Sequence, residues 1–249
     1  MTTYPANTDL PQVVLNYADG HRSHQVPIHD GRAIGQRLSL DRQGFELRHH
    51  ETAVSNFYDA AEVRAIHYPE VERLLTAATG ATRAVAFEHD VRCAPRRGVG
   101  DVRGPVHVVH DDYTEVSAPE RVRLYLPAEA DTLLRRRYAV INVWRSIKGT
   151  VRDTPLAVCE AQTMHAGDRI PTTGGVKHEV YLFHFSLNHQ WYYFPAMGTD
   201  EALLLKCFDS VQDGRARFTA HTAFADPTAP PDAPARESIE VRALVFFNA

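Results

Sequence analysis

The chain has 249 residues, of which 44% are hydrophobic and 23% are charged, which is the composition of an ordinary globular protein. A formal net charge of −4 gives no reason to expect a nucleic-acid or membrane partner. Three widely spaced cysteines without a CxxC pair argue against a structural zinc site and are typical of a reducing, cytoplasmic setting.

The length predicts one domain over residues 1–249, because β-rich domains of about 200–250 residues are common. We expect residues 1–80 to supply flanking strands and a helix, and residues 81–249 to supply a β core. The first residues carry neither a basic nor an apolar stretch, so we expect no signal peptide. No apolar run is long enough to span a membrane. A homo-oligomer is left open.

The first third of the chain predicts short strands and one clear helix. Turn residues separate strand-like pieces over residues 11–44. Residues 69–79 predict a helix, because Pro69 stands in its first turn, apolar residues recur at helical spacing, and Gly80 follows its end. Residues 82–91 then predict a strand.

A second helical stretch precedes a β-rich half. Ser117-Ala-Pro-Glu120 has the spacing of a capping box, and we expect helical structure from there to about Arg137, with a break at Pro127. Beyond it, segments rich in Val, Tyr, Phe and Leu alternate with turns, as in a sandwich or barrel. The expected strands are 138–147, 156–162, 179–186, 190–195, 203–208, 216–224 and 238–247. We therefore expect a mainly β protein with flanking helices and one packed double sheet.

The candidate chemistry lies at the end of an apolar segment, residues 105–109, which we interpret as a short strand ending in His110-x-Asp112. Residues two apart in a strand share a face, so the imidazole and the carboxylate project side by side. They form two thirds of the 2-His-1-carboxylate triad that holds Fe(II), and His221 is the candidate for the third ligand. The alternatives are a solvated strand end and a hydrogen-bonded core histidine. A rival His-x-Glu pair at His49 lies in a polar segment.

The last expected strand carries a charged face. Arg236, Ser238, Glu240 and Arg242 share one side by period two. Two guanidinium groups are costly to bury unless they bind something anionic. A guanidinium receives a carboxylate through paired N–H donors, and a nearby hydroxyl can add a third bond. The alternative is an exposed face with cross-strand ion pairs.

Polar residues also interrupt the apolar strand at 138–147. Asn142 and Trp144 share one face, and Arg145 points to the opposite one. Arg145 is a candidate for binding the carboxylate of a co-substrate or substrate, or for an internal ion pair. Lys206 and Asp209 are expected to form a structural pair.

Two loops are candidate lids over a site. One is the basic loop 96–104, which is otherwise a solvated loop, and the other is the Pro-rich loop 225–235.

Several blocks of this sequence resemble one protein family. They are Asn142-Val-Trp-Arg145-Ser-Ile-Lys-Gly-Thr-Val-Arg-Asp153, His189-Gln-Trp-Tyr-Tyr-Phe194, Lys206-Cys-Phe-Asp209-Ser210, His221-Thr-Ala-Phe-Ala-Asp226-Pro227 and Arg236-Glu-Ser-Ile-Glu-Val-Arg242. They are similar to the hydroxylase/desaturase group of natural-product pathways, which includes AsaB-, NvfI- and CmcJ-type proteins. The resemblance runs over most of the chain.

The resemblance implies an Fe(II)/2-oxoglutarate-dependent oxygenase that uses O2 and is built on a double-stranded β-helix of the jelly-roll or cupin type. Carried over residue by residue, it implies that His110, Asp112 and His221 bind the iron. It also implies that Arg236 and Ser238 hold the distal carboxylate of 2-oxoglutarate.

The match departs from the family in one spacing. The Pro-rich loop separates His221 from Arg236 by more residues than the resemblance leads us to expect. Arg242 and Arg145 therefore remain competitors for the carboxylate, and Asn142 is a further cofactor-binding candidate.

The expected function is oxidation of a small-molecule natural-product intermediate by hydroxylation, desaturation or a related C–H oxidation, with decarboxylation of 2-oxoglutarate to succinate. Two alternatives remain: a non-catalytic partner subunit of a biosynthetic enzyme, and a metal-dependent hydrolase that uses the same ligands. The residues do not identify the substrate, because the same ligand geometry serves many outcomes.

Overall fold

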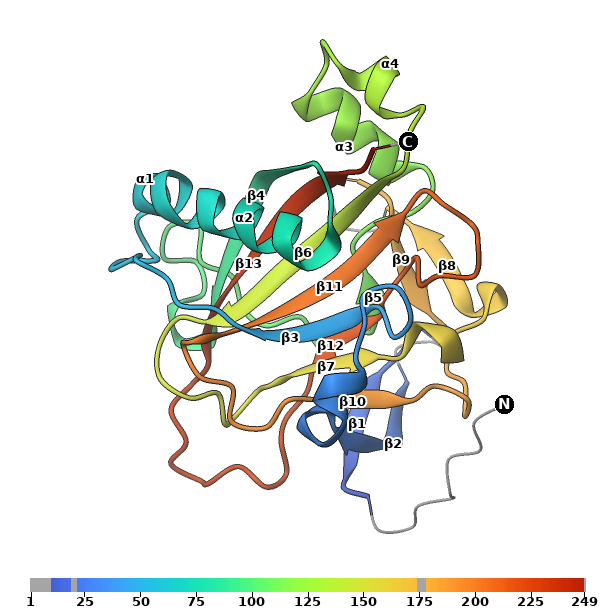
Figure 1. Ribbon diagram of the computed structural model, residues 1–249. Coiled ribbons are helices and arrows are strands. Elements are labelled where there is room, and N and C mark those ends of the chain that lie inside the picture. The colour runs from blue at the N-terminus through green and yellow to red at the C-terminus, as the bar shows by residue number, and fades with distance from the viewer. Residues whose placement is uncertain (1–9, 19–21, 174–177, 249) are drawn as a thin grey trace.

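Two β-sheets form the centre of the computed structural model, which describes residues 10–18, 22–173 and 178–248. One sheet has eight strands and the other has five, and their facing sides share a hydrophobic core. Helices cover the outer face of the five-stranded sheet, and a short helical pair projects beyond its end (Figure 1). The described chain is mainly β with flanking helices, as the sequence predicts.

In spatial order, the larger sheet contains β1 (Gln12–Asn16), β2 (Ser23–Asp30), β10 (Trp191–Tyr193), β7 (Leu156–Cys159), β12 (His221–Ala223), β5 (His110–Asp111), β9 (Val180–Phe183) and β8 (Arg169–Thr172). The smaller sheet contains β3 (Phe45–His49), β11 (Glu201–Asp209), β6 (Tyr138–Ser146), β13 (Glu237–Phe246) and β4 (Arg83–Cys93). The α-helices are α1 (Ala60–Glu62), α2 (Tyr68–Thr79), α3 (Ser117–Tyr125) and α4 (Ala130–Leu133), and η2 (Val63–His67) is a π-helical turn. Short 3₁₀ turns are η1 (Gly31–Arg37), η3 (Ala94–Arg96), η4 (Ala161–Thr163) and η5 (Ala166–Asp168).

The two faces of β13 have different roles. Ile239, Val241 and Ala243 belong to the core beneath the helical layer. Because strand side chains alternate, Ser238 and Arg242 face the other sheet. The charged face predicted from the sequence is therefore turned inward, and its side chains are almost completely buried.

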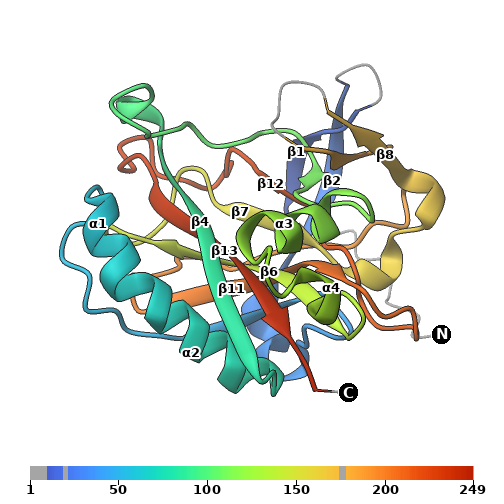
Figure 2. The same cartoon turned by 90° about the horizontal axis from the view of Figure 1, so that it is seen from above.

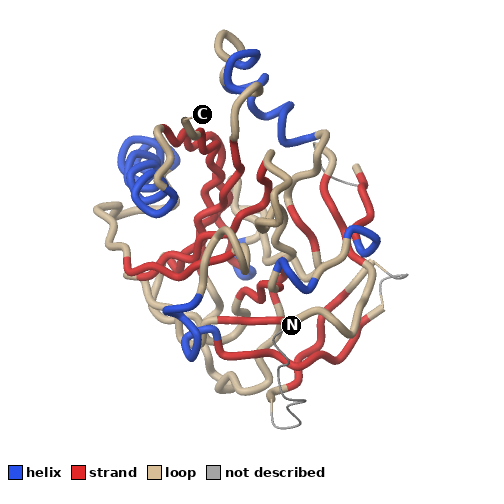
Figure 3. Tube along the Cα trace, turned by 45° about the vertical axis from the view of Figure 1, so that its right-hand side comes forward, coloured by secondary structure: helices blue, strands red, loops and turns tan. Residues whose placement is uncertain are grey.

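Helix α2 packs on the outer face of the smaller sheet. It begins with Pro69 in its first turn and ends at Gly80, which adopts the left-handed conformation with φ of 69°. Val71 and Leu75 are buried beneath it. Figure 2 shows the helix running beside β4, and Figure 3 shows a helix packed against one side of the strands. The helix predicted over residues 69–79 is confirmed.

Several elements differ from the sequence-based expectations. The helical stretch after Pro127 is limited to α4, the strand expected at 216–224 is limited to β12, and β8 was not predicted. The N-cap of α3 is Val116 rather than Ser117, and its side chain makes no capping bond. Residues 105–109 do not form a regular strand and contain an isolated bridge from Val108 to Asn16. Their backbone groups bond irregularly: Val109 N donates to Asn16 O at 2.8 Å, and Ala223 N donates to Val106 O at 2.8 Å.

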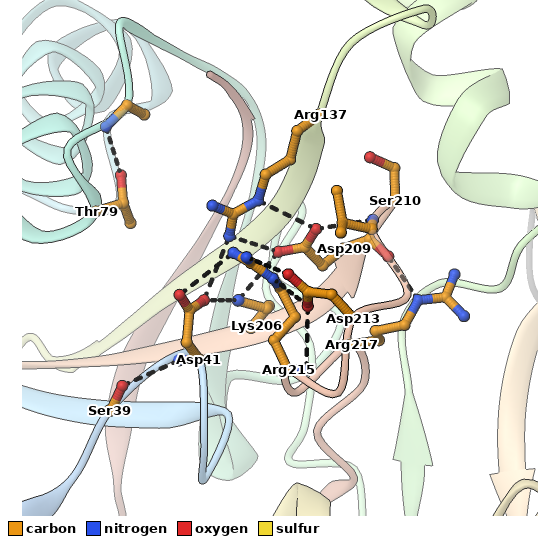
Figure 4. Close-up of polar contacts among 12 residues, drawn as sticks. Ser39, Asp41, Thr79, Arg137, Lys206, Asp209, Ser210, Asp213, Arg215 and Arg217 are labelled. Carbon is orange, nitrogen blue, oxygen red and sulfur yellow. Dashed lines mark hydrogen bonds and ion pairs between the residues drawn. The ribbon is translucent and has the colours of Figure 1, made fainter. Parts of the chain in front are cut away.

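An ion-pair cluster joins the turn at Asp41 to β11 and to the start of β6 (Figure 4). Lys206 Nζ donates to Asp209 Oδ2 at 3.1 Å and to Asp41. Arg137 pairs with the same Asp209 oxygen at 2.8 Å, and Arg215 pairs with Asp41 at 3.3 Å. Lys206 and Asp209 are buried, so each requires the other's charge. The expected Lys206–Asp209 pair is confirmed. Over the described part of the chain, no helix has the length and apolar character to cross a membrane.

Candidate metal centre

The fold brings His110, Asp112 and His221 together. β5 and β12 are antiparallel neighbours, and His110 lies directly opposite His221 in their register. One nitrogen of each imidazole and one carboxylate oxygen all lie within 4.8 Å of one another. His110 Nε2 lies 3.7 Å from Asp112 Oδ1. Two histidines and one carboxylate at such separations have the donor composition of a 2-His-1-carboxylate site.

Backbone carbonyls orient both imidazoles. His110 Nδ1 donates to Val108 O at 2.8 Å, and His221 Nδ1 donates to Thr219 O at 3.0 Å. A carbonyl oxygen can only accept, so each Nδ1 carries a proton and is the donor. Each Nε2 is therefore the ring nitrogen available to a metal, which binds its lone pair.

Two donors hold the second oxygen of Asp112. Asn142 Nδ2 donates to Asp112 Oδ2 at 2.7 Å, and Arg242 Nε donates to the same oxygen at 3.0 Å. The other oxygen, Oδ1, faces His110. The carboxylate is thus held so that one oxygen is directed toward the imidazoles.

The guanidinium of Arg242 is fully engaged. Besides its bond to Asp112, Nη1 donates to Asp90 at 2.9 Å and Nη2 donates to Glu240 at 2.8 Å. Each of its three nitrogens therefore has a carboxylate partner. The pKa of Arg242 is well above its ordinary value, because Asp112 and the other acids outweigh the effect of burial.

The electrostatics favour a cation between the three candidate ligands. Burial and the neighbouring His221 imidazole lower the pKa of His110 to about 3. Burial alone would raise the pKa of Asp112, but Arg242 and the two imidazoles outweigh it and lower that pKa below its ordinary value. At neutral pH the site combines a neutral His110 with an ionised carboxylate.

A small cavity adjoins these residues and is lined by Trp144, Leu156, Val106 and Arg236, among others. Arg236 is 4% exposed, and its Nη1 donates to Thr154 O at 2.6 Å. Burial lowers the pKa of Arg236 to about 10.

Two buried polar atoms near the start of β13 have no partner among the described residues. Arg236 Nε and the hydroxyl of Ser238 are buried without a hydrogen bond to any described residue. Ser238 is the second residue of β13 and Arg236 immediately precedes the strand, so alternation directs both to the inward side. Buried donors without a partner are uncommon, and these two fit a site that receives an anionic group.

Arg145 lies on the other face of β6, as its alternation with Asn142 predicts. Its Nη2 donates to His50 O at 2.9 Å and to Thr199 O, and its Nη1 donates to His50 Nδ1 at 3.2 Å. His67 lies in this same buried cluster, and burial lowers its pKa to about 4. Arg145 is therefore bonded within the layer between the smaller sheet and its helices.

Comparisons with known proteins agree with this geometry. A family described as "Oxidoreductase/YMDC permease-like domain" matches residues 2–246. The chain is 34% identical over 222 residues to the alpha-ketoglutarate-dependent dioxygenase phiK of a fungal species, covering 84% of this chain and 80% of that protein. It is 32% identical over 255 residues to the hydroxylase/desaturase efuI of Hormonema carpetanum, covering 92% of this chain and 85% of that protein.

A solved structure, the iron and alpha-ketoglutarate-dependent endoperoxidase NvfI, superposes with a TM-score of 0.86. It is 30% identical, and the match covers 92% of this chain and 87% of NvfI. The chain belongs to the hydroxylase/desaturase family of Fe(II)/2-oxoglutarate-dependent oxygenases. Membership in this family confirms the resemblance and the double-stranded β-helix. It also confirms the expected enzyme class and the expected cofactor and co-substrates, Fe(II), 2-oxoglutarate and O2.

Two polar residues beside the candidate ligands of this oxygenase lie outside the sequence-based predictions. Asp111 is fully buried, and its Oδ2 accepts from Thr219 N at 2.8 Å, which ties β5 to the residues before His221. Arg92 lines the cavity and bonds to Gly104 O at 3.1 Å. Arg92 follows Asp90 by two residues in β4, so alternation of strand side chains could have predicted that both lie on the inward face.

Proposed function

We propose that this family member is an Fe(II)/2-oxoglutarate-dependent oxygenase that binds its iron through His110, Asp112 and His221. The observation that carries the proposal is the convergence of one donor atom from each of these three residues within 4.8 Å. Both imidazoles donate from Nδ1 to backbone carbonyls, and Asn142 holds the carboxylate of Asp112. These bonds orient the three side chains as a divalent metal requires.

We further propose that Arg236 and Ser238 hold the distal carboxylate of 2-oxoglutarate. Both carry a buried polar atom without a partner, and Arg236 lines the cavity beside the two histidines. Arg242, one competitor, uses all three nitrogens on carboxylates. Arg145, the other, lies on the opposite face of β6 and donates to His50 and Thr199 there. A carboxylate would satisfy the two unpartnered atoms and offset the charge of Arg236.

The remaining residues of the site exclude water and position the reactants. When bound, iron with 2-oxoglutarate and O2 supplies the oxidant for C–H oxidation, and 2-oxoglutarate leaves as succinate and CO2. Trp144, Leu156 and Val106 give the cavity an apolar wall, which favours an apolar part of a small-molecule substrate. The loops 96–104 and 225–235 are proposed lids, since their neighbours Val106 and Ala223 line the cavity.

The finer assignments rest on family membership and composition. We propose that residues 1–249 form one oxygenase domain and that the reaction is a hydroxylation, a desaturation or a related C–H oxidation. We propose that the protein works in the cytoplasm without a nucleic-acid or membrane partner, and that it can form a homo-oligomer.

Succinate formation tests this function without knowledge of the substrate. The protein is incubated with Fe(II), 2-oxoglutarate and air, and succinate is quantified by mass spectrometry. We expect slow, iron-dependent succinate release from the wild type that His110→Ala abolishes. His49→Ala is the matched control, because His49 is an exposed histidine outside the site. Equal succinate release from wild type and His110→Ala would refute the assignment.

A further inference from the structure

A second cavity, of about 180 Å³, lies apart from the metal centre and shares no lining residue with the cavity there. Its wall is formed by the turn around η4, the first residue of β8 and the segment 214–218. Three guanidinium groups line it, from Arg169, Arg215 and Arg217. Their side chains are only 15–21% exposed.

One of these cations is already neutralised. Arg215 donates to both oxygens of Asp213, at 2.7 and 2.6 Å, and also contacts Asp41 at 3.3 Å (Figure 4). It has no need of a further anion and forms a wall of the cavity.

The other two cations share a single carboxylate. Arg169 Nη1 lies 3.7 Å from Glu115 Oε1, and Arg217 Nη1 lies 3.3 Å from the same oxygen. The second oxygen of Glu115 accepts from the hydroxyl of Tyr181. Among the described residues, Glu115 is therefore the one acid that forms an ion pair with these two guanidinium groups. In addition, Arg169 Nη1 is buried and has no hydrogen bond to any described residue.

Both guanidinium groups are held in place. Arg169 lies over the ring of Phe218 at 4.5 Å and Arg217 at 5.1 Å, measured from each Cζ to the ring centroid. Arg217 Nε also donates to Asp209 O at 2.7 Å. Fixed guanidinium groups lose little freedom when they bind a ligand, which favours affinity.

We propose that this cavity binds the oxyanion group, phosphoryl or carboxylate, of a small molecule. An oxyanion would neutralise the excess cation and accept the hydrogen bond that Arg169 Nη1 lacks. Met164 and Phe218 also line the cavity, so it suits an anion carried on an apolar or aromatic body. This binding site is independent of the proposed oxygenase reaction.

The test is isothermal titration of the full-length, metal-free protein with inorganic phosphate and with phenyl phosphate. Arg169→Gln removes the unpartnered donor, and Glu115→Gln removes the competing acid. Two exposed residues outside the cavity, Arg136 and Asp131, give charge-matched controls as Arg136→Gln and Asp131→Asn.

We expect at least one probe to bind the wild type. That probe should bind Arg169→Gln roughly tenfold more weakly, since the loss of one charged hydrogen bond has this size. It should bind Glu115→Gln more tightly than the wild type. Both controls should stay within about twofold of the wild type. Tighter binding of phenyl phosphate would support a ligand with an aromatic body, and equal binding of the two probes would support free phosphate as the ligand. The proposal is overturned if neither probe binds, or if binding survives Arg169→Gln and is lost in Arg236→Gln, which would locate the anion at the metal centre.

Discussion

Asn142 is expected to control metal affinity without contacting the metal. Its amide is buried and donates to Asp112 Oδ2 at 2.7 Å, while Oδ1 faces His110. Asn142→Leu keeps similar volume but leaves Arg242 as the one remaining donor to that oxygen among the described residues. A hydrogen bond to a charged group contributes about 1.5–3 kcal/mol, so we expect Mn²⁺ affinity to fall roughly ten- to a hundredfold.

Mn²⁺ titration monitored by electron paramagnetic resonance at pH 7.5 measures this directly, because free Mn²⁺ gives the signal. Val143→Ala is the control: Val143 is the next residue of β6 and is buried on the opposite face. Both variants should lose stability, but only Asn142→Leu should lose metal affinity. The reasoning is refuted if Asn142→Leu binds Mn²⁺ within twofold of the wild type, or if Val143→Ala weakens binding equally.

Three further predictions concern other parts of the molecule. The pKa of His67 is about 4 in the folded protein, below the usual value of about 6.5, so the unfolded chain takes up the proton first as pH falls. Urea unfolding at pH 7.5 and 5.0 should show that the wild type loses about 2 kcal/mol more than His67→Gln; equal losses would contradict it. Gly44 has φ of 90°, and a Cβ there would collide with Thr219 Oγ1. Gly44→Ala should therefore lower the free energy of unfolding by more than about 2 kcal/mol. An unchanged thermal midpoint would contradict this prediction. Arg236→Lys keeps the charge but not the planar fork, so the 2-oxoglutarate concentration for half-maximal succinate release should rise roughly tenfold; an unchanged value would assign the carboxylate to another residue.

The sequence predicts most of the local order in this protein. Helix α2 was predictable because Pro69, the apolar spacing and Gly80 all act within one segment. The His110-x-Asp112 pair was predictable for the same reason, since two residues in an extended segment share a face. The structure of residues 105–109 was not predictable. Their backbone bonds to Asn16 and Ala223, which are distant in sequence, and these contacts decide whether a regular strand forms.

Long-range contacts also decide which arginine is free. Period two directs Arg236, which immediately precedes β13, and Arg242 within it to the same side, and nothing local distinguishes them. In the folded chain Arg242 meets acids from β4 and from the end of β5, whereas Arg236 keeps an unpartnered Nε. Alternation likewise separates Arg145 from Asn142, but which face of β6 meets the site depends on how the two sheets pack.

Anaerobic titration of the metal-free protein with Fe(II) and 2-oxoglutarate tests the central claim most directly, because chelation of the iron by 2-oxoglutarate gives a weak visible charge-transfer band. We predict that the band develops with the wild type, is lost in His110→Ala and needs more 2-oxoglutarate in Arg236→Ala. Absence of both the band and iron binding in the wild type would contradict the oxygenase assignment and would favour a non-catalytic partner subunit.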